Sequence, residues 1–383
     1  MSEPELQETT VLEAARKATG LDDFGGDDFR PGLAVLLETF RTGAGLTPKG
    51  RKLAFRRVVQ LLATRLRVAE ALRRHPEIRE RPLRRPVYLT GLPRTGTSAL
   101  FNLLGSDPAA RPLLLWEGIF PDPMEGLEPG ATDPRYEAVK ASYDRMRERD
   151  PGFTKIHFAS ADTPEECVLL LAHAFRDAQM GIEVLMEPYA SWFRAQDLRP
   201  AYCYYRTLLQ MLDWQRPGAR WLLKSPAHLW ALDALAECFP DVCIVMTHRD
   251  PLECVPSYCS MMQALLRSRG CAPLPDLGER VLDYLAASLE RGLAQRDRLG
   301  RERFFDVDYR SFVADPLATV EPLYDHFGLE RTPDVARALR DFAAAHPQSR
   351  HGEHRYDLER YGLTTRRIET RLAGYIERFG LAT

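Results

Sequence analysis

The chain has 383 residues, of which 45% are apolar and 28% charged, with a formal net charge of −2 at pH 7. This composition is typical of a soluble globular protein and does not suit a molecule that coats nucleic acid. No apolar run reaches the roughly 18 residues of a membrane helix. The acidic start MSEPELQETT does not resemble a signal peptide, so we expect a cytoplasmic protein without a membrane span. The seven cysteines show no CxxC pair or metal spacing, and we expect buried free thiols.

Residues 1–86 are expected to form helices packed on the rest of the chain, because apolar residues between positions 53 and 72 follow helical spacing. This segment is strongly basic. Between positions 51 and 85, twelve arginines and lysines stand against three glutamates. The charge fits either a solvated helix face or a docking surface for an acidic partner such as a carrier protein.

After Pro86 the pattern changes to short apolar runs that alternate with helical segments. Four strands are expected, at 87–91, 221–224, 243–247 and 304–307, and a helix signal follows each of the first three. This alternation predicts an α/β fold with a central parallel sheet flanked by helices, in which ligands bind at the carboxyl ends of the strands. We therefore predict one α/β domain over 87–383, with a helical cap at about 113–217.

The first strand leads into the segment VYLTGLPRTGTSAL. Gly91, Gly96 and Ser98 have the spacing of a phosphate-binding loop, but Thr97 occupies the position of its lysine. A glycine turn before a helix exposes amides that hold an oxyanion, and Arg94 adds a bidentate cation. Without the lysine, the loop suits one short anionic group better than a triphosphate with magnesium; a purely structural turn is the alternative. The expected anion-binding residues are Pro93, Arg94, Thr95, Gly96, Thr97 and Ser98.

The second loop is WLLKSPAH. Ser225 is expected to cap a helix, which places Lys224 at the strand tip, where its ammonium can meet a phosphate. His228 falls at the third helical position, and the helix N-terminus disfavours its charged form, so we expect a neutral imidazole able to accept a proton. The alternatives are a surface salt bridge for Lys224 and a packing role for His228.

The third loop is CIVMTHRDP. Asp250 and Glu253 have the spacing of a helix start, which leaves Arg249 at the strand end and Ser257 about two turns into the helix. Arg249 and Ser257 together are expected to hold a second phosphate, unless Arg249 only pairs with a helix acid.

Taken in this order, the three loops resemble the sulfotransferase superfamily that uses 3′-phosphoadenosine-5′-phosphosulfate (PAPS), and the form of the motifs is closest to its bacterial branch. The resemblance covers roughly residues 45–383. It implies that the first loop holds the 5′-phosphosulfate, that Lys224 contacts the bridging oxygen, and that Arg249 and Ser257 hold the 3′-phosphate. The segment FDVDYRSFV resembles a later segment of the superfamily in which a tyrosine lies near the adenine, and the resemblance implies this position for Tyr309.

Two features depart from the superfamily. Animal cytosolic members carry a lysine where Arg94 stands, whereas the tyrosylprotein branch also has an arginine. Their terminal glycine-rich loop is missing here, and RHGEHRY is expected to replace it, with Arg350 or Arg355 over the 3′-phosphate.

The implied activity is transfer of a sulfuryl group from PAPS to a hydroxyl of a small-molecule, lipid or carrier-bound acceptor, with PAP as product and no metal. Lys224 and Arg94 are expected to stabilise charge on the leaving phosphate. Three candidates remain for the base: His228, Glu117 in LLLWEG, and Glu165. Glu166 fits a capping box with Thr163.

The segments YASWF, YCYYR and FPDPM give the expected cap an aromatic character. They suit either a core lining or a pocket for a hydrophobic alcohol. The alternative functions are a P-loop kinase and a nucleotide-binding protein without sulfotransfer activity. The sequence is also compatible with a homodimer.

Overall fold

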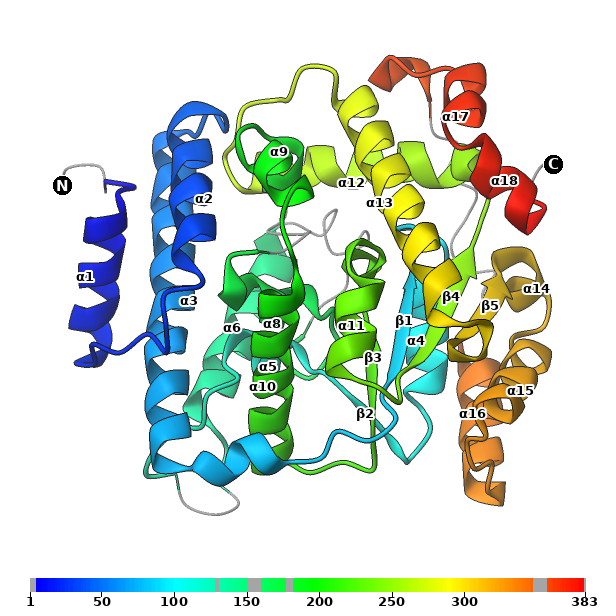
Figure 1. Cartoon of the computed structure of the whole chain (residues 1–383), viewed down its shortest axis with the longest axis horizontal. Helices are drawn as coiled ribbons and strands as arrows, with labels where there is room; N and C mark the ends of the chain where they lie inside the picture. The colour runs from blue at the N-terminus through cyan, green and yellow to red at the C-terminus, as the bar shows by residue number, and fades with distance from the viewer. Residues whose placement is uncertain (1–4, 128–130, 150–159, 177–181, 347–356, 382–383) are drawn as a thin grey trace. The chain divides into compact units, whose positions relative to one another are not determined.

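A computed structural model describes residues 5–127, 131–149, 160–176, 182–346 and 357–381. The chain divides into two compact units (Figure 1). The helical unit comprises residues 1–82, 113–217 and 262–273, and the sheet unit comprises 83–112, 218–261 and 274–383. The expected cap at 113–217 therefore groups with the N-terminal helices. The proposed division into an N-terminal segment and one α/β domain stays a prediction.

The sheet unit is built on a five-stranded parallel sheet in the order β2-β3-β1-β4-β5. The four predicted strands are confirmed with shifts of one residue at some ends, and a short fifth strand, β2, was not predicted. The strands are β1 (Val87–Gly91), β2 (Ala110–Pro112), β3 (Arg220–Lys224), β4 (Cys243–His248) and β5 (Phe304–Asp308). The register pairs Leu89 with Lys224 and Gly91 with Thr247, so the carboxyl ends of these strands meet at one edge.

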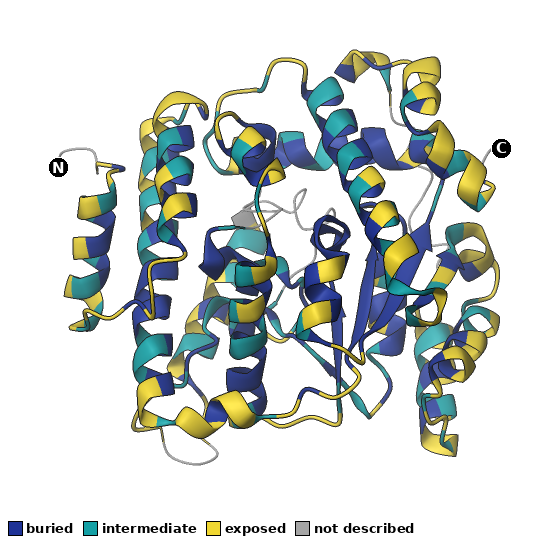
Figure 2. Ribbon diagram, in the orientation of Figure 1, coloured by how far each residue is buried: buried dark blue, intermediate teal, exposed yellow. Residues whose placement is uncertain are grey.

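Helices cover both faces of this sheet. On one face, Val87 and Leu89 share a buried core with α4 (Thr97–Leu104), α14 (Tyr309–Ala314), α15 (Pro316–Phe327) and α16 (Pro333–Ala345). The opposite face carries Tyr88, whose ring contacts His228 and Phe239. The 3-10 helix η4 (Pro226–Trp230) packs against β1, and α13 (Leu277–Leu299) packs in turn on η4 and on α11 (Leu232–Cys238). Figure 2 shows the central strands β1 and β4 buried along their length, whereas α13 alternates between buried and exposed residues.

The last helices of the chain pack on α13. Arg367 of α17 (Thr365–Arg371) pairs with Glu279, and Arg378 of α18 (Ala373–Phe379) pairs with Asp297. Figure 1 shows both helices in red beside α13. A further helix, α12 (Pro251–Ser268), follows β4 directly.

The helical unit is organised around the long helix α3, which begins at Pro48 after the cap residue Thr47. Its helices are α1 (Glu8–Thr19), α2 (Arg30–Thr42), α3 (Pro48–Arg74), α5 (Leu115–Ile119), α6 (Pro134–Arg149), α8 (Val168–Leu171), α9 (Tyr189–Arg194) and α10 (Arg199–Gln215). Several basic residues of the N-terminal segment have acidic partners within this unit. Arg67 contacts Asp122 at 2.7 Å and Arg81 contacts Asp213 at 2.6 Å. Part of the positive charge of the N-terminal segment is therefore used in ion pairs within the helical unit.

One cation of α3 is completely buried. Arg65 donates to the carbonyl of His173 at 2.9 Å, and its guanidinium lies 4.4 Å from the ring centre of Phe29 and 4.2 Å from that of Tyr204. Asp28 accepts a further hydrogen bond from it at 3.3 Å. Desolvation of this charge is thus offset by aromatic faces and hydrogen bonds.

All seven cysteines are free thiols, as predicted, but only four are buried: Cys203 is exposed, and Cys238 and Cys271 are partly buried. Across the described ranges, no helix combines the length and apolar character needed to cross a membrane.

Candidate functional site

The first loop turns sharply between β1 and α4. Arg94 and Gly96 both adopt left-handed backbone conformations, with φ values of 71° and 85°. Thr95 fixes the turn, because its hydroxyl donates to the carbonyl of Leu92 at 2.7 Å and lies 2.6 Å from the hydroxyl of Thr247. Thr247 was not among the predicted site residues; it pairs with Gly91 in the sheet, and its position two residues before Arg249 is the signal in the sequence.

Arg94 connects the first loop to the third. Its Nε donates to the hydroxyl of Ser257 at 3.0 Å, and its carbonyl accepts a hydrogen bond from Nη1 of Arg249 at 3.2 Å. Arg94 lies in the loop that follows β1, Arg249 directly follows the last residue of β4, and Ser257 lies in the second turn of α12. The structure thus brings together three predicted anion-binding residues that are far apart in the sequence.

Arg249 is held between a ring and a carboxylate. Its guanidinium lies 4.1 Å from the ring centre of Tyr309, and it pairs with Glu253. The ring of Tyr309 in turn lies against Gly96. The Nε of Arg249 is shielded from solvent and makes no hydrogen bond within the described residues. A buried donor of this kind is costly unless it has a partner, so it fits an anion bound beside Tyr309.

Lys224 ends β3 on the face that carries α4. It is only 4% exposed, its ammonium donates to the hydroxyl of Ser98 at 3.1 Å, and it lies 5.7 Å from the ring centre of Phe101. Ser98 itself is exposed. Thr97 is buried as the first residue of α4, and Pro93 is buried within the loop. Lys224 therefore places a largely desolvated cation beside the first turn of α4, where amides without helical partners are found.

His228 occupies a different position from Lys224. It lies in η4, whose cap is Ser225 as predicted, and the Ser225 hydroxyl accepts from the amide of Ala227 at 3.1 Å. Its ring meets Tyr88 edge-on at 5.0 Å, on the face of the sheet opposite to α4. Burial lowers the pKa of His228 to about 3, so the ring is neutral. The neutral form was predicted, but burial is its cause, and not the helix N-terminus.

The two candidate glutamates belong to the helical unit. Glu117 is 2% exposed; Oε2 accepts from the amide of Leu114 at 3.0 Å, and Oε1 lies 2.9 Å from Nη2 of Arg216. Glu165 is also buried, near Tyr143. Burial raises the pKa of Tyr143 to about 12, and the charge of Glu165 adds to this shift.

The expected capping box of Thr163 and Glu166 is wrong, because α8 begins only at Val168, with Cys167 at its N-cap. Pro164 instead forms an isolated antiparallel bridge with Leu114. Arg350 and Arg355 lie outside the described residues.

The aromatic segments expected around an acceptor line the core of the helical unit. Tyr189 and Phe193 of α9 are buried and stacked, and Tyr202 and Tyr205 of α10 pack together at 6.0 Å. These contacts favour the interpretation as a core lining for both segments.

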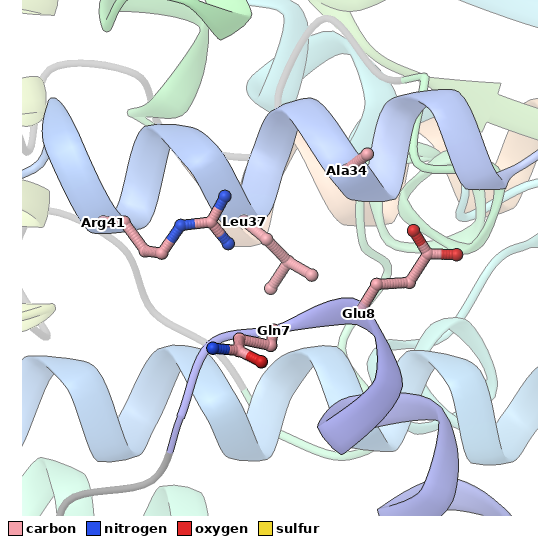
Figure 3. A pocket seen from close by; sticks show the side chains of 5 residues that line it. All are labelled: Gln7, Glu8, Ala34, Leu37 and Arg41. Atoms are coloured by element: carbon pink, nitrogen blue, oxygen red, sulfur yellow. The ribbon is translucent and has the colours of Figure 1, made fainter.

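A pocket of about 330 Å³ lies between the start of α1 and α2 in the helical unit (Figure 3). Gln7, Glu8, Ala34, Leu37 and Arg41 line it, and none of them belongs to the three loops. Its charged groups are engaged locally, since Glu8 pairs with Arg30 and Arg41 donates to the carbonyl of Leu6. We therefore assign the candidate site to the strand ends of the sheet unit and not to this pocket.

Comparison with known proteins identifies sulfotransferases that are similar to this chain in sequence and in structure. A model of the sulfotransferase family matches residues 86–334. The omega-hydroxy-beta-dihydromenaquinone-9 sulfotransferase Stf3 of Mycobacterium bovis is 24% identical over 309 residues, which cover 77% of this chain and 75% of that protein.

Two solved structures share the fold over nearly the whole chain. Sulfotransferase STF1 from Mycobacterium tuberculosis H37Rv is 35% identical with a TM-score of 0.85, covering 97% of this chain and 100% of that one. Sulfotransferase STF9 from Mycobacterium avium is 29% identical with a TM-score of 0.89, covering 100% of this chain and 99% of that one.

Proposed function

The chain belongs to the sulfotransferase family, and on that premise we propose that it transfers a sulfuryl group from PAPS to a hydroxyl of a small-molecule or lipid acceptor. The observation that carries this proposal is the convergence of cations at the strand ends. Arg94, Lys224 and Arg249 come from three loops of one parallel sheet, and the loop that resembles a phosphate-binding loop lacks its lysine. Such a site suits anionic groups that do not need a magnesium ion.

The donor would be held at two places. Arg249 and Ser257 would bind the 3′-phosphate, with Tyr309 near the adenine, and the buried Nε of Arg249 is a donor suited to a phosphate oxygen. The first loop, from Pro93 to Ser98, would bind the 5′-phosphosulfate through backbone amides and hydroxyls. Arg350 and Arg355 stay candidates for the 3′-phosphate on the resemblance alone.

Bound PAPS supplies an activated sulfuryl group on a phosphate leaving group. Transfer of this kind depends on in-line positioning and charge stabilisation more than on covalent chemistry. Lys224 is suited to stabilise the leaving oxygen, because its ammonium is largely desolvated and held by Ser98. Arg94 would support the same charge if its guanidinium leaves Ser257 when the donor binds.

The base that takes the acceptor's proton is His228, Glu117 or Glu165. His228 is neutral and so chemically able to accept a proton, but its ring packs on Tyr88 and not on the α4 face. Glu117 is a carboxylate held by Leu114 and Arg216. All three residues remain candidates, and substituting each in turn separates them.

The acceptor class rests on the named relative, whose substrate is a hydroxylated menaquinone. An apolar alcohol of lipid character is therefore the first acceptor class to test. A carrier-bound hydroxyl would also suit the chemistry.

A kinase is less well supported, since Asp250 serves as a helix cap and accepts from the amide of Leu252 at 2.8 Å. Calorimetric titration with PAP, and separately with ATP plus magnesium, tests the proposal. We expect magnesium-independent binding of PAP that is much tighter than binding of ATP. A preference for ATP with magnesium would contradict the proposed sulfuryl transfer and favour phosphoryl transfer.

A further inference from the structure

The C-terminal helix α18 reaches the strand end that carries Arg249. Tyr375 of α18 is 4% exposed, and its hydroxyl lies 3.3 Å from Nδ1 of His248, the last residue of β4. The ring of Phe379, one turn further along α18, stacks on the His248 ring at 3.7 Å between ring centres. Two residues of the last helix thus hold the residue that directly precedes Arg249.

His248 is tied to the neighbouring strand through its other nitrogen. Nε2 lies 2.7 Å from Oδ1 of Asp306 in β5. Both oxygens of Asp306 accept hydrogen bonds from Arg296 of α13, each at 2.6 Å. Burial lowers the pKa of His248, and the hydrogen bond to Asp306 only partly opposes this, so the ring is neutral.

The neutral ring fixes the direction of these hydrogen bonds. An ionised carboxylate can accept hydrogen bonds but cannot donate them, so Nε2 of His248 carries the proton and donates to Asp306. Nδ1 of His248 then accepts from the hydroxyl of Tyr375. Burial raises the pKa of Tyr375 well above its ordinary value, while a hydrogen bond from the backbone of Arg249 acts in the opposite direction. The chain of hydrogen bonds therefore runs from the Arg249 backbone through Tyr375 and His248 to Asp306.

We infer that Tyr375 and His248 are positioning residues for Arg249, and that the C-terminal helix thereby sets the affinity of the enzyme for the 3′-phosphate end of its donor. The inference rests on the proposed role of Arg249. That residue's side chain leaves the strand end beside Tyr309, so a small displacement of its backbone moves the guanidinium relative to that ring. Hydrogen bonds in a buried chain polarise one another, which makes the arrangement sensitive to loss of one member.

The ion pairs between the last helices and α13 do not explain this coupling. Arg367 with Glu279 and Arg378 with Asp297 are solvent-exposed pairs, which usually contribute little. The buried contacts of Tyr375 and the stacking of Phe379 on His248 are the specific link between α18 and the site.

The test is the affinity for PAP of the full-length Tyr375→Phe variant, which keeps the ring and removes the hydroxyl. We expect the Kd for PAP to rise about three- to tenfold, the value of one hydrogen bond. At saturating PAPS, kcat should be unchanged while KM for PAPS rises. Tyr324→Phe is the matched control, because Tyr324 is a buried tyrosine of the same unit whose hydroxyl donates to Asp107 at 2.8 Å. It should leave PAP affinity unchanged.

Repeating the Tyr375→Phe substitution in the Arg249→Ala variant shows whether Tyr375 affects PAP binding through Arg249. If Tyr375 acts through Arg249, adding Tyr375→Phe to Arg249→Ala should not weaken PAP binding further. An equal loss in both backgrounds, or no loss in the single variant, would overturn the inference while leaving the donor site intact. Unchanged PAP affinity in Arg249→Ala alone would overturn the proposed donor site and the inference with it. Should Tyr375→Phe fold poorly, Asp306→Asn interrupts the same chain from β5 and is expected to raise the Kd in the same direction.

Discussion

Gly96 lies so close to Tyr309 that a methyl group on Gly96 would come within 2.6 Å of Cδ2 of that ring. The φ of 85° at Gly96 adds backbone strain for any other residue. We expect Gly96→Ala to lower the free energy of unfolding by about 1–3 kcal/mol. PAP affinity should fall as well, because Tyr309 must move from its place beside Arg249. Denaturant unfolding and calorimetry measure the two effects.

Gly328→Ala is the control for this variant. Gly328 also has a left-handed φ, of 57°, but a methyl group there meets nothing within 4 Å. It should share the backbone strain and leave PAP binding unchanged. Equal PAP affinities in Gly96→Ala and the wild type would show that Tyr309 is not part of the donor site.

Lys224→Met tests the charge beside the leaving oxygen. The substitution keeps the length of the side chain and removes the ammonium that contacts Ser98. We expect kcat to fall by about 10²–10³-fold, as for loss of one preorganised group that stabilises transition-state charge. The Kd for PAP should change much less. A loss confined to donor affinity, with kcat intact, would assign Lys224 to ground-state binding.

Arg249→Ala should weaken PAP binding by roughly 2–5 kcal/mol, because it leaves a desolvated phosphate without its partner. Calorimetric titration gives the value directly. Arg340→Ala, which removes an exposed arginine on α16 of the same unit, should have no effect. A similar Kd for both variants would remove Arg249 from the site.

His228→Gln, Glu117→Gln and Glu165→Gln identify the base when compared under the same conditions. Loss of the base should lower kcat by about 10²–10⁴-fold. Glu117→Gln should also lower stability by about 1–3 kcal/mol, since it removes a buried charge that pairs with Arg216. Each kcat is therefore compared with the folded fraction from circular dichroism. Wild-type kcat in all three variants would place the base elsewhere.

Two buried histidines predict acid sensitivity. Burial lowers the pKa of His228 to about 3 and that of His173 to about 4, both below the ordinary value of 6.5. The unfolded chain therefore binds protons that the folded chain does not, and stability is lost as pH falls below about 6.5 towards 4. Each histidine contributes a slope of up to about 1.4 kcal/mol per pH unit.

Urea unfolding between about pH 7 and about pH 5 checks this slope. His228→Gln should reduce it, whereas substitution of the exposed His346 by glutamine should not. An unchanged slope in His228→Gln would contradict the assignment of a neutral buried ring.

The sequence predicted those parts of the protein that local physics determines. Runs of apolar residues at 87–91 and 243–247 are long enough to be read as buried strands, and the glycine turn after the first marks the loop. The strand Ala110–Pro112 is too short to show periodicity, and it forms because its backbone pairs with β3. Glu166 lies before the start of α8, and the nearby Pro164 pairs with Leu114, a contact between distant residues that the local sequence does not encode.

Tertiary contacts also decide the electrostatics of the site. The sequence placed His228 at a helix start, but only the fold shows that Tyr88 covers its ring and that burial governs its pKa. The link between Arg94 and Ser257 joins two loops that were each assigned to a different phosphate.

The buried position of Arg65 has a consequence for how the chain can be divided. Its guanidinium contacts the ring of Phe29, which precedes the first strand in the sequence. It also contacts the carbonyl of His173 and the ring of Tyr204, which follow that strand. A chain shortened to begin at Leu83 would lose this cation together with α1, α2 and α3. The remaining helices between 113 and 217 would then expose the surface that those three helices cover. The first 82 residues therefore belong to the same compact unit as residues 113–217.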